Sequence, residues 1–170
     1  SGSWDSFAVT GIKPIGSLTV GLLGFGRIAK KVAEKLKPFG AEIIAHDEFI
    51  SREIFEEYDV EAVSFEDLMQ RSEHLSLHVP LTEDTKHIIN ADSLKLMQDG
   101  AYIINTCRGG IIKEDDLVQA IESGKVGGAA LDEAVHRRGE VSVGVPPQAH
   151  EAACGAVDRV LSHQVPSLAA

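Results

Sequence analysis

The sequence predicts an α/β protein of the doubly wound type, with a mostly parallel sheet of about six strands in a single domain. Short apolar runs alternate with segments of helical periodicity from residue 18 to about residue 132, and a glycine-rich turn ends the first run. Alternation of this kind implies helical crossovers between parallel strands. At 170 residues and 44% hydrophobic content, the chain has enough apolar side chains for one sizeable core.

Six short apolar runs are expected to form the strands. They cover residues 18–23, 41–45, 61–63, 74–79, 101–105 and 126–131. In a doubly wound sheet the predicted spatial order is 3-2-1-4-5-6, and ligands bind at the carboxyl ends of the strands, where the order reverses.

The first predicted strand runs directly into the glycine turn, Gly24-Phe25-Gly26-Arg27-Ile28-Ala29. Gly24 allows a tight turn, Gly26 leaves space for phosphates, and Ala29 keeps the following helix close to the strand. Backbone N–H groups at the start of that helix then face a pyrophosphate. Glycines also punctuate ordinary strand-to-helix turns, so the turn alone leaves a purely structural role open.

The helix after the turn is expected to end at Gly40 and to carry four large apolar residues near one face: Ile28, Val32, Leu36 and Phe39. The second strand then ends at Asp47, where a carboxylate accepts hydrogen bonds from an adenosine ribose. At about 5 Å and an effective dielectric of about 20, its charge repels a 2′-phosphate by roughly 3 kcal/mol. NAD is therefore favoured over NADP, although an ordinary polar strand end remains the alternative.

Capping signals place the helices between the later strands. Ser64 to Asp67 has the pattern of a capping box, and Ser123 with Gly124 closes a helix that begins near Lys113. Residues 1–17 are expected to form an irregular arm, 18–134 the dinucleotide-binding domain, and 135–147 an irregular connection. A final helix is expected over 148–162, followed by a tail to residue 170, with four apolar residues on one side: Ala153, Val157, Val160 and Leu161.

Composition narrows the classes of partner. The net charge of −10 and the absence of clustered Lys and Arg argue against nucleic acid. No apolar stretch approaches the length of a membrane span. Cys107 and Cys154 have no metal-ligand spacing, so reduced thiols in a cytoplasmic protein without a bound metal are expected.

Two further motifs follow the fourth and fifth predicted strands, at residues 78–85 and 105–110, and a third, Gly128-Ala129-Ala130-Leu131-Asp132, ends the sixth. Together with the glycine turn, their order resembles the cofactor domain of the D-isomer-specific 2-hydroxyacid dehydrogenases. That family includes phosphoglycerate-dehydrogenase-like enzymes and the C-terminal-binding-protein corepressors. The resemblance covers roughly residues 4–134 and implies a Rossmann fold that binds NAD.

The resemblance also implies roles for individual residues. Arg27 and Ile28 would meet the pyrophosphate, and Asp47 the ribose. The walls of the adenosine and nicotinamide-ribose site would come from His78, Val79, Pro80 and Thr85. Thr106 and Cys107 would border the nicotinamide, and Asp132 would hold its carboxamide. Arg108 matches the family arginine that binds the carboxylate and keto oxygen of a 2-hydroxy or 2-keto acid, and a planar guanidinium suits that role.

His78 is equally consistent with a structural role, and Cys107 is expected to be a small packing residue rather than a nucleophile, since hydride transfer needs none. The sequence departs from the family after Asp132. Relatives carry a Glu-Pro segment and then a Pro-His pair, which supply the acid–base histidine and its carboxylate partner. Neither is recognisable here, and Glu133, Glu140 and His150 are the available substitutes.

Relatives also carry about half of a separate substrate domain before the position of Trp4. We therefore expect an NAD-binding domain with little or no turnover as this chain. The alternative is an NAD-responsive interaction module like the corepressors. Its apolar surface, which includes the final helix and the arm with Trp4 and Phe7, would mediate assembly, for example as a homodimer.

Overall fold

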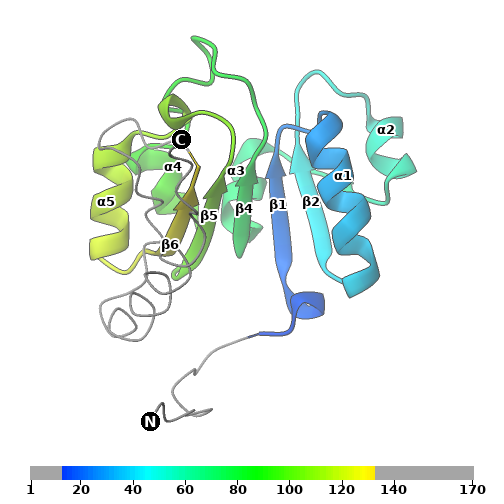
Figure 1. Ribbon diagram of the computed structural model, residues 1–170, viewed down its shortest axis with the longest axis horizontal. Helices are drawn as coiled ribbons and strands as arrows, with labels where there is room; N and C mark the ends of the chain where they lie inside the picture. Colours follow the sequence, from blue (N-terminus) through cyan, green and yellow to red (C-terminus); the bar gives the residue numbers. More distant parts are fainter. Residues whose placement is uncertain (1–12, 133–170) are drawn as a thin grey trace, which may run out of the picture.

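All neighbouring strands of the sheet run parallel, in the order β3-β2-β1-β4-β5-β6 (Figure 1). The computed structural model describes residues 13–132 of the chain. The strands are β1 Thr19–Leu23, β2 Glu42–His46, β3 Glu61–Ala62, β4 His74–Leu77, β5 Ala101–Asn105 and β6 Val126–Leu131. The predicted doubly wound fold and strand order are confirmed.

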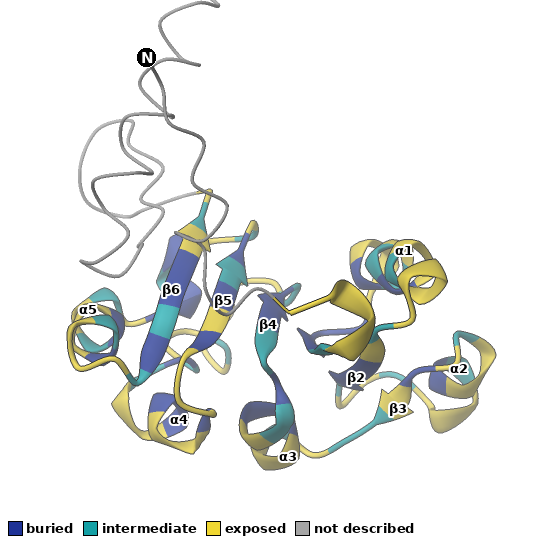
Figure 2. Ribbon diagram, turned by 90° about the horizontal axis from the view of Figure 1, so that it is seen from below, coloured by how far each residue is buried: buried dark blue, intermediate teal, exposed yellow. Residues whose placement is uncertain are grey.

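Within residues 13–132, five α-helices and two 3-10 turns connect the strands, and a third 3-10 turn precedes β1. The helices are α1 Arg27–Leu36, α2 Arg52–Glu57, α3 Phe65–Arg71, α4 Ala91–Leu96 and α5 Glu114–Glu122, and the turns are η1 Ile15–Ser17, η2 Lys37–Phe39 and η3 Gly109–Ile111. Helices α1 and α2 lie on one side of the sheet and α3 and α4 on the other (Figure 2). The chain changes sides between β3 and β4, so the order reverses at the gap between β1 and β4.

The core is divided between the two faces of the sheet. Under α1 and α2 lies a cluster that includes Leu22, Phe25, Ala29, Ile43, Ala45 and Phe55. On the other face, α3, α4 and α5 cover a larger cluster that includes Leu68, Met69, Leu75, Leu94, Ile103 and Leu117. Near-continuous apolar strands of this kind are expected when both faces of a parallel sheet are covered.

Helix α1 follows the predicted apolar face only in part. Val32 and Leu36 are partly buried and pack against the core, whereas Ile28 is 66% exposed and Phe39 is 61% exposed. The fully buried residues of the helix are Ala29 and Ala33. The small alanines let the helix lie close to the sheet, and Ile28 sits in the first turn. Phe39 lies outside the α-helix, in η2, because Pro38 interrupts the helical pattern. The predicted stop at Gly40 is confirmed by its left-handed φ of 80°.

The capping signals agree with the helix ends. Ser64 Oγ accepts a hydrogen bond from Asp67 N–H at 3.0 Å and donates one to Asp67 Oδ2 at 2.7 Å. Gly124 follows α5 with a φ of 78°. A complete capping box at the start of α4, made by Asn90 and Ser93, was not anticipated from the sequence.

The predicted connection 135–147 and final helix 148–162 lie outside the described residues, as does the arm up to residue 12. Within residues 13–132, no helix has the length and apolar character to cross a membrane.

Gly21 in β1 provides a test of how closely α3 packs on the sheet. A Cβ at Gly21 would lie 1.9 Å from Ser72 Oγ and 3.0 Å from Ser72 Cβ. Gly21→Ala should therefore lower the unfolding free energy by about 1–3 kcal/mol through overpacking. Ser72→Ala removes the nearest atom, so the double variant should lose less than the sum of the single variants. Urea unfolding of all four proteins measures this coupling, and strictly additive losses would contradict the contact.

Candidate cofactor-binding site

The glycine turn is seated against the chain that leaves β4. Gly24 has a φ of 87°, and a Cβ there would lie 2.9 Å from the carbonyl carbon and oxygen of His78 and from Val79 Cγ1. Its N–H donates to the carbonyl of His46 at the end of β2. A residue without a side chain is therefore required, and the turn draws together the carboxyl ends of β1, β2 and β4.

Gly26 faces open space, in contrast to Gly24. No heavy atom lies within 4 Å of the position that its Cβ would occupy. Gly26 is also the N-cap of α1, so the first turn has no side-chain cap for its N–H groups. The described structure thus provides both the room and the backbone donors that a pyrophosphate requires. Arg27 and Ile28, the next two residues, are exposed at this helix end.

Asp47 connects the glycine turn to the loop after β2. Its Oδ2 accepts a hydrogen bond from Phe25 N–H at 2.8 Å, and its Oδ1 accepts one from Phe49 N–H at 2.9 Å. Each carboxylate oxygen has a further lone pair. The carboxylate is therefore fixed in place with acceptor capacity to spare, which fits the geometry expected for a ribose ligand.

Phe25, in the middle of the glycine turn, fixes the turn to the core. This role was not predicted from the sequence. Its fully buried ring stacks on Phe55 with centroids 4.7 Å apart and meets Tyr58 edge-on at 5.8 Å. Because Phe55 and Tyr58 belong to α2 and its C-cap, the glycine turn is fixed to that helix. A large aromatic residue between two glycines is the signal that could have indicated this anchor.

His78 lies just beyond β4, which ends two residues earlier than predicted. Its N–H donates to the carbonyl of Leu23 at 2.7 Å, and its Nε2 is 3.0 Å from Ser76 Oγ. Its Nδ1 is buried and has no hydrogen-bond partner. Burial lowers the pKa of this imidazole below its ordinary value, so it is neutral at pH 7.

The rest of the loop after β4 is closed by its own hydrogen bonds. Thr85 Oγ1 donates to the carbonyl of Pro80 at 2.6 Å and accepts from Thr82 N–H at 2.8 Å. Leu81 from this loop packs on Gly110, where a Cβ would lie 3.1 Å from Leu81 Cδ2. Two of the predicted wall residues, Pro80 and Thr85, are thus brought together, and the loop rests on the segment that follows β5.

Asn105, the last residue of β5, shapes the loop that carries Arg108. Its buried side chain accepts from Cys107 N–H at 3.0 Å and donates to the carbonyl of Arg108 at 2.9 Å. Cys107 Sγ donates to the carbonyl of Leu77, and burial raises the pKa of this thiol. A packing role for Cys107 fits these contacts better than a nucleophilic one. Asn105 begins the motif at residues 105–110, and its bracing of this loop was not predicted from the sequence.

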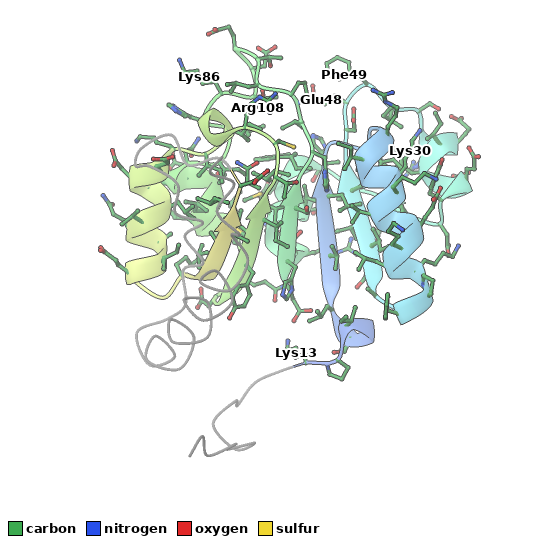
Figure 3. All side chains as sticks on the ribbon, viewed as in Figure 1. Lys13, Lys30, Glu48, Phe49, Lys86 and Arg108 are labelled. Atoms are coloured by element: carbon green, nitrogen blue, oxygen red, sulfur yellow. The ribbon has the colours of Figure 1, made fainter. Side chains whose placement is uncertain are left out.

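The remaining predicted residues lie at the same edge of the sheet. Arg108 is exposed, and its guanidinium donates to the carbonyl of Cys107 at 2.8 Å. Thr106 is exposed beside it, and Asp132 N–H donates to the carbonyl of Asn105 at 3.0 Å. Arg108 and Lys86 extend from the loops after β5 and β4, while Glu48 and Phe49 lie on the loop after β2 (Figure 3). Lys13 lies at the opposite edge of the sheet.

The described residues contain no cluster of His, Cys, Asp and Glu suited to a metal ion. The site therefore consists of an open glycine turn, a fixed carboxylate on the β2 side, and an exposed arginine on the β5 side. This order along one sheet edge suits an extended dinucleotide.

Comparison with known families gives the same result. Residues 1–161 match the family described as D-isomer specific 2-hydroxyacid dehydrogenase, NAD binding domain. This chain belongs to that family. The expected cofactor, NAD, and the expected enzyme family are thereby confirmed.

Individual relatives support the assignment. The chain is 46% identical over 116 residues to a D-2-hydroxyacid dehydrogenase (NAD(+)) from Clostridioides difficile, covering 68% of this chain and 35% of that protein. It is 44% identical over 131 residues to a hydroxypyruvate reductase from Thermotoga maritima, covering 77% and 42%. These relatives are named as a dehydrogenase and a reductase, so the corepressor alternative gains no support from them.

The fold is also shared with a solved NAD complex. A D-isomer specific 2-hydroxyacid dehydrogenase from Lactobacillus delbrueckii ssp. bulgaricus superposes with a TM-score of 0.70 at 31% identity, covering 88% of this chain and 47% of that one. The chain therefore spans less than half the length of each of these three proteins.

Two glycine variants should separate folding from cofactor binding. Gly24→Ala forces a side chain into the backbone of His78 at a positive φ, so we expect a loss of about 2 kcal/mol or more in unfolding free energy. Gly26→Ala adds a methyl group to open space and should leave stability within about 0.5 kcal/mol while weakening NAD binding at least tenfold. Urea unfolding and calorimetry with NAD measure the two effects. Undiminished NAD affinity of Gly26→Ala would contradict a pyrophosphate at this position.

Burial of His78 predicts a pH dependence of stability. The folded-state pKa lies below the ordinary value of 6.5, so the unfolded chain binds the proton more tightly. Stability is then fully present above about pH 6.5 and falls on acidification, by at most about 1.4 kcal/mol per pH unit for one group. His78→Gln should reduce this slope in urea unfolding between about pH 7 and pH 5. An identical slope in the variant would contradict the buried neutral imidazole.

Proposed function

We propose that this chain forms the NAD-binding half of an oxidoreductase that interconverts small 2-hydroxy acids and 2-keto acids. The observation that supports this proposal best is the Asp47 carboxylate, which is fixed between the N–H groups of Phe25 and Phe49 beside the open position at Gly26. This arrangement offers a ribose acceptor and a pyrophosphate cradle side by side. The residue roles carried over from the family stay predictions.

At the other end of the site, we propose that Arg108 binds the substrate carboxylate. Its guanidinium is exposed and its backbone is fixed by Asn105, so the charged group is free to make two parallel hydrogen bonds to a carboxylate. Asp132, held to β5 through its N–H, is positioned to accept from the nicotinamide carboxamide. Bound NAD supplies the hydride acceptor of the reaction.

Turnover requires groups beyond the described residues. A second lobe would exclude water and orient the substrate against the nicotinamide. The acid–base pair would come from that lobe or from the sequence after Asp132, where Glu133, Glu140 and His150 are the candidates. We further propose that the protein works in the cytoplasm, as a homodimer, without nucleic-acid or membrane partners.

Calorimetry with NAD and NADP tests the cofactor assignment. A charge repulsion of roughly 3 kcal/mol corresponds to an NAD preference on the order of 100-fold. Asp47→Ala removes both the ribose acceptor and this repulsion, so NAD should bind about tenfold more weakly and the preference should largely disappear.

Glu48→Ala is the matched control, because it removes a neighbouring exposed carboxylate while leaving Asp47 and its two N–H partners in place. We expect less than a threefold change in the ratio of the two affinities. Equal binding of NAD and NADP by the folded wild-type chain, or an equal effect of the two substitutions, would overturn the proposed role of Asp47.

A further inference from the structure

One half of one sheet face carries no helix from the described residues. On the side of α1 and α2, helices cover β1, β2 and β3. On the opposite side, α3 packs mainly on β1 and β2, and α4 and α5 lie over the half of the sheet formed by β4, β5 and β6 (Figure 2). The alternation of burial along β5 shows the consequence, because Ala101, Ile103 and Asn105 are buried while Tyr102 is 42% exposed.

Strand register defines this surface, which we call the open half-face. His74, Tyr102 and Gly128 are adjacent across three strands, and Ser76, Ile104 and Ala130 form the next row. Tyr102 stacks on His74 with ring centroids 5.3 Å apart, and Ala130 is exposed. Because the residues of β6 on this surface have small side chains, another backbone can approach the sheet closely.

The nature of the sheet indicates that the open half-face is built to be covered. Parallel sheets occur almost always with both faces packed, since their strands are apolar on both sides. His74 is polar but half-buried at this surface, and burial lowers the pKa of its ring. A neutral imidazole beside an exposed tyrosine is a surface suited to a mixed apolar and hydrogen-bonding contact.

We infer that the open half-face is the docking surface for residues 148–162 of this same chain. The described structure ends at Asp132, at the carboxyl end of β6, and residues 133–147 reach up to about 50 Å when extended. A helix over 148–162 would be about 22 Å long and about 10 Å wide. It matches strands of about 13–20 Å spaced about 4.8 Å apart.

The sequence of this segment fits the surface. Ala153, Val157, Val160 and Leu161 share one side of the predicted helix, so small and branched apolar side chains would face the two rows of the open half-face. Residues 1–12 are a poorer match, because they show no comparable run of apolar residues at helical spacing and contain Gly2 and Gly11.

Cys154 provides a direct probe, since it falls at the border of the predicted apolar side. In a Cys107→Ser background it is the sole cysteine. Docking should slow its reaction with a thiol reagent at least tenfold relative to the urea-unfolded chain. Ala130→Glu places a charge in the open half-face and should accelerate the reaction about tenfold. Val118→Glu, at a 52% exposed position on α5, is the matched control and should leave the rate unchanged.

Cross-linking tests the same contact without disrupting it. With Ala130→Cys in the Cys107→Ser background, a short bismaleimide should join Cys154 to the introduced thiol within one chain, whereas Val118→Cys should yield no such product. If circular dichroism shows that Ala130→Glu does not fold, cross-linking still tests whether residues 148–162 dock on the open half-face.

Other occupants give distinct results that would overturn the proposal. Cross-links between chains would assign the open half-face to a second copy. A red shift of Trp4 emission in Ala130→Glu, with unchanged Cys154 reactivity, would assign it to residues 1–12, since Trp4 is the sole tryptophan. Reaction of Cys154 at the unfolded rate in the parent protein would exclude docking of residues 148–162.

Discussion

The close approach of the chain at Gly24 to the chain at His78 is the contact on which the site depends. Gly24 has a φ of 87° and no room for a Cβ, so this position is incompatible with any side chain. His78 N–H continues the ladder by donating to Leu23, so the ends of β1 and β4 stay together beyond the last strand residues. Asp47 lies on one side of this contact, and the loop shaped by Asn105 lies on the other.

Most of the fold followed from the sequence because its signals are local and repeated. Six apolar runs separated by helical segments leave few alternatives once crossover connections are required. The tight turn at Gly24 was likewise predictable, since it depends on the absence of a side chain. Gly40 and Gly124 marked helix ends correctly for the same reason, as both adopt left-handed backbone conformations. The roles of the glycine turn and of Asp47 in binding NAD stay predictions.

The errors and omissions arose where tertiary packing outweighs periodicity. Ile28 and Phe39 continue an apolar pattern, yet the helix approaches the sheet through Ala29 and Ala33, and the larger side chains remain exposed. Phe25 and Asn105 act through contacts with α2 and with the loop after β5, which no local pattern specifies. The role predicted for Arg108 rests only on its motif, because an exposed loop arginine has no distinguishing physical signature in a single sequence, and that role stays a prediction.

The bracing of the Arg108 loop by Asn105 suggests how this architecture diversifies. One buried amide sets the path of the loop, and the backbone carbonyl of the same residue receives Asp132 N–H, so a single residue joins the Arg108 loop to the end of β6. Relatives at 40% to 46% identity over this region carry names as different as hydroxypyruvate reductase and D-lactate dehydrogenase. A shared cofactor-domain fold has thus been retained in proteins whose names specify different substrates.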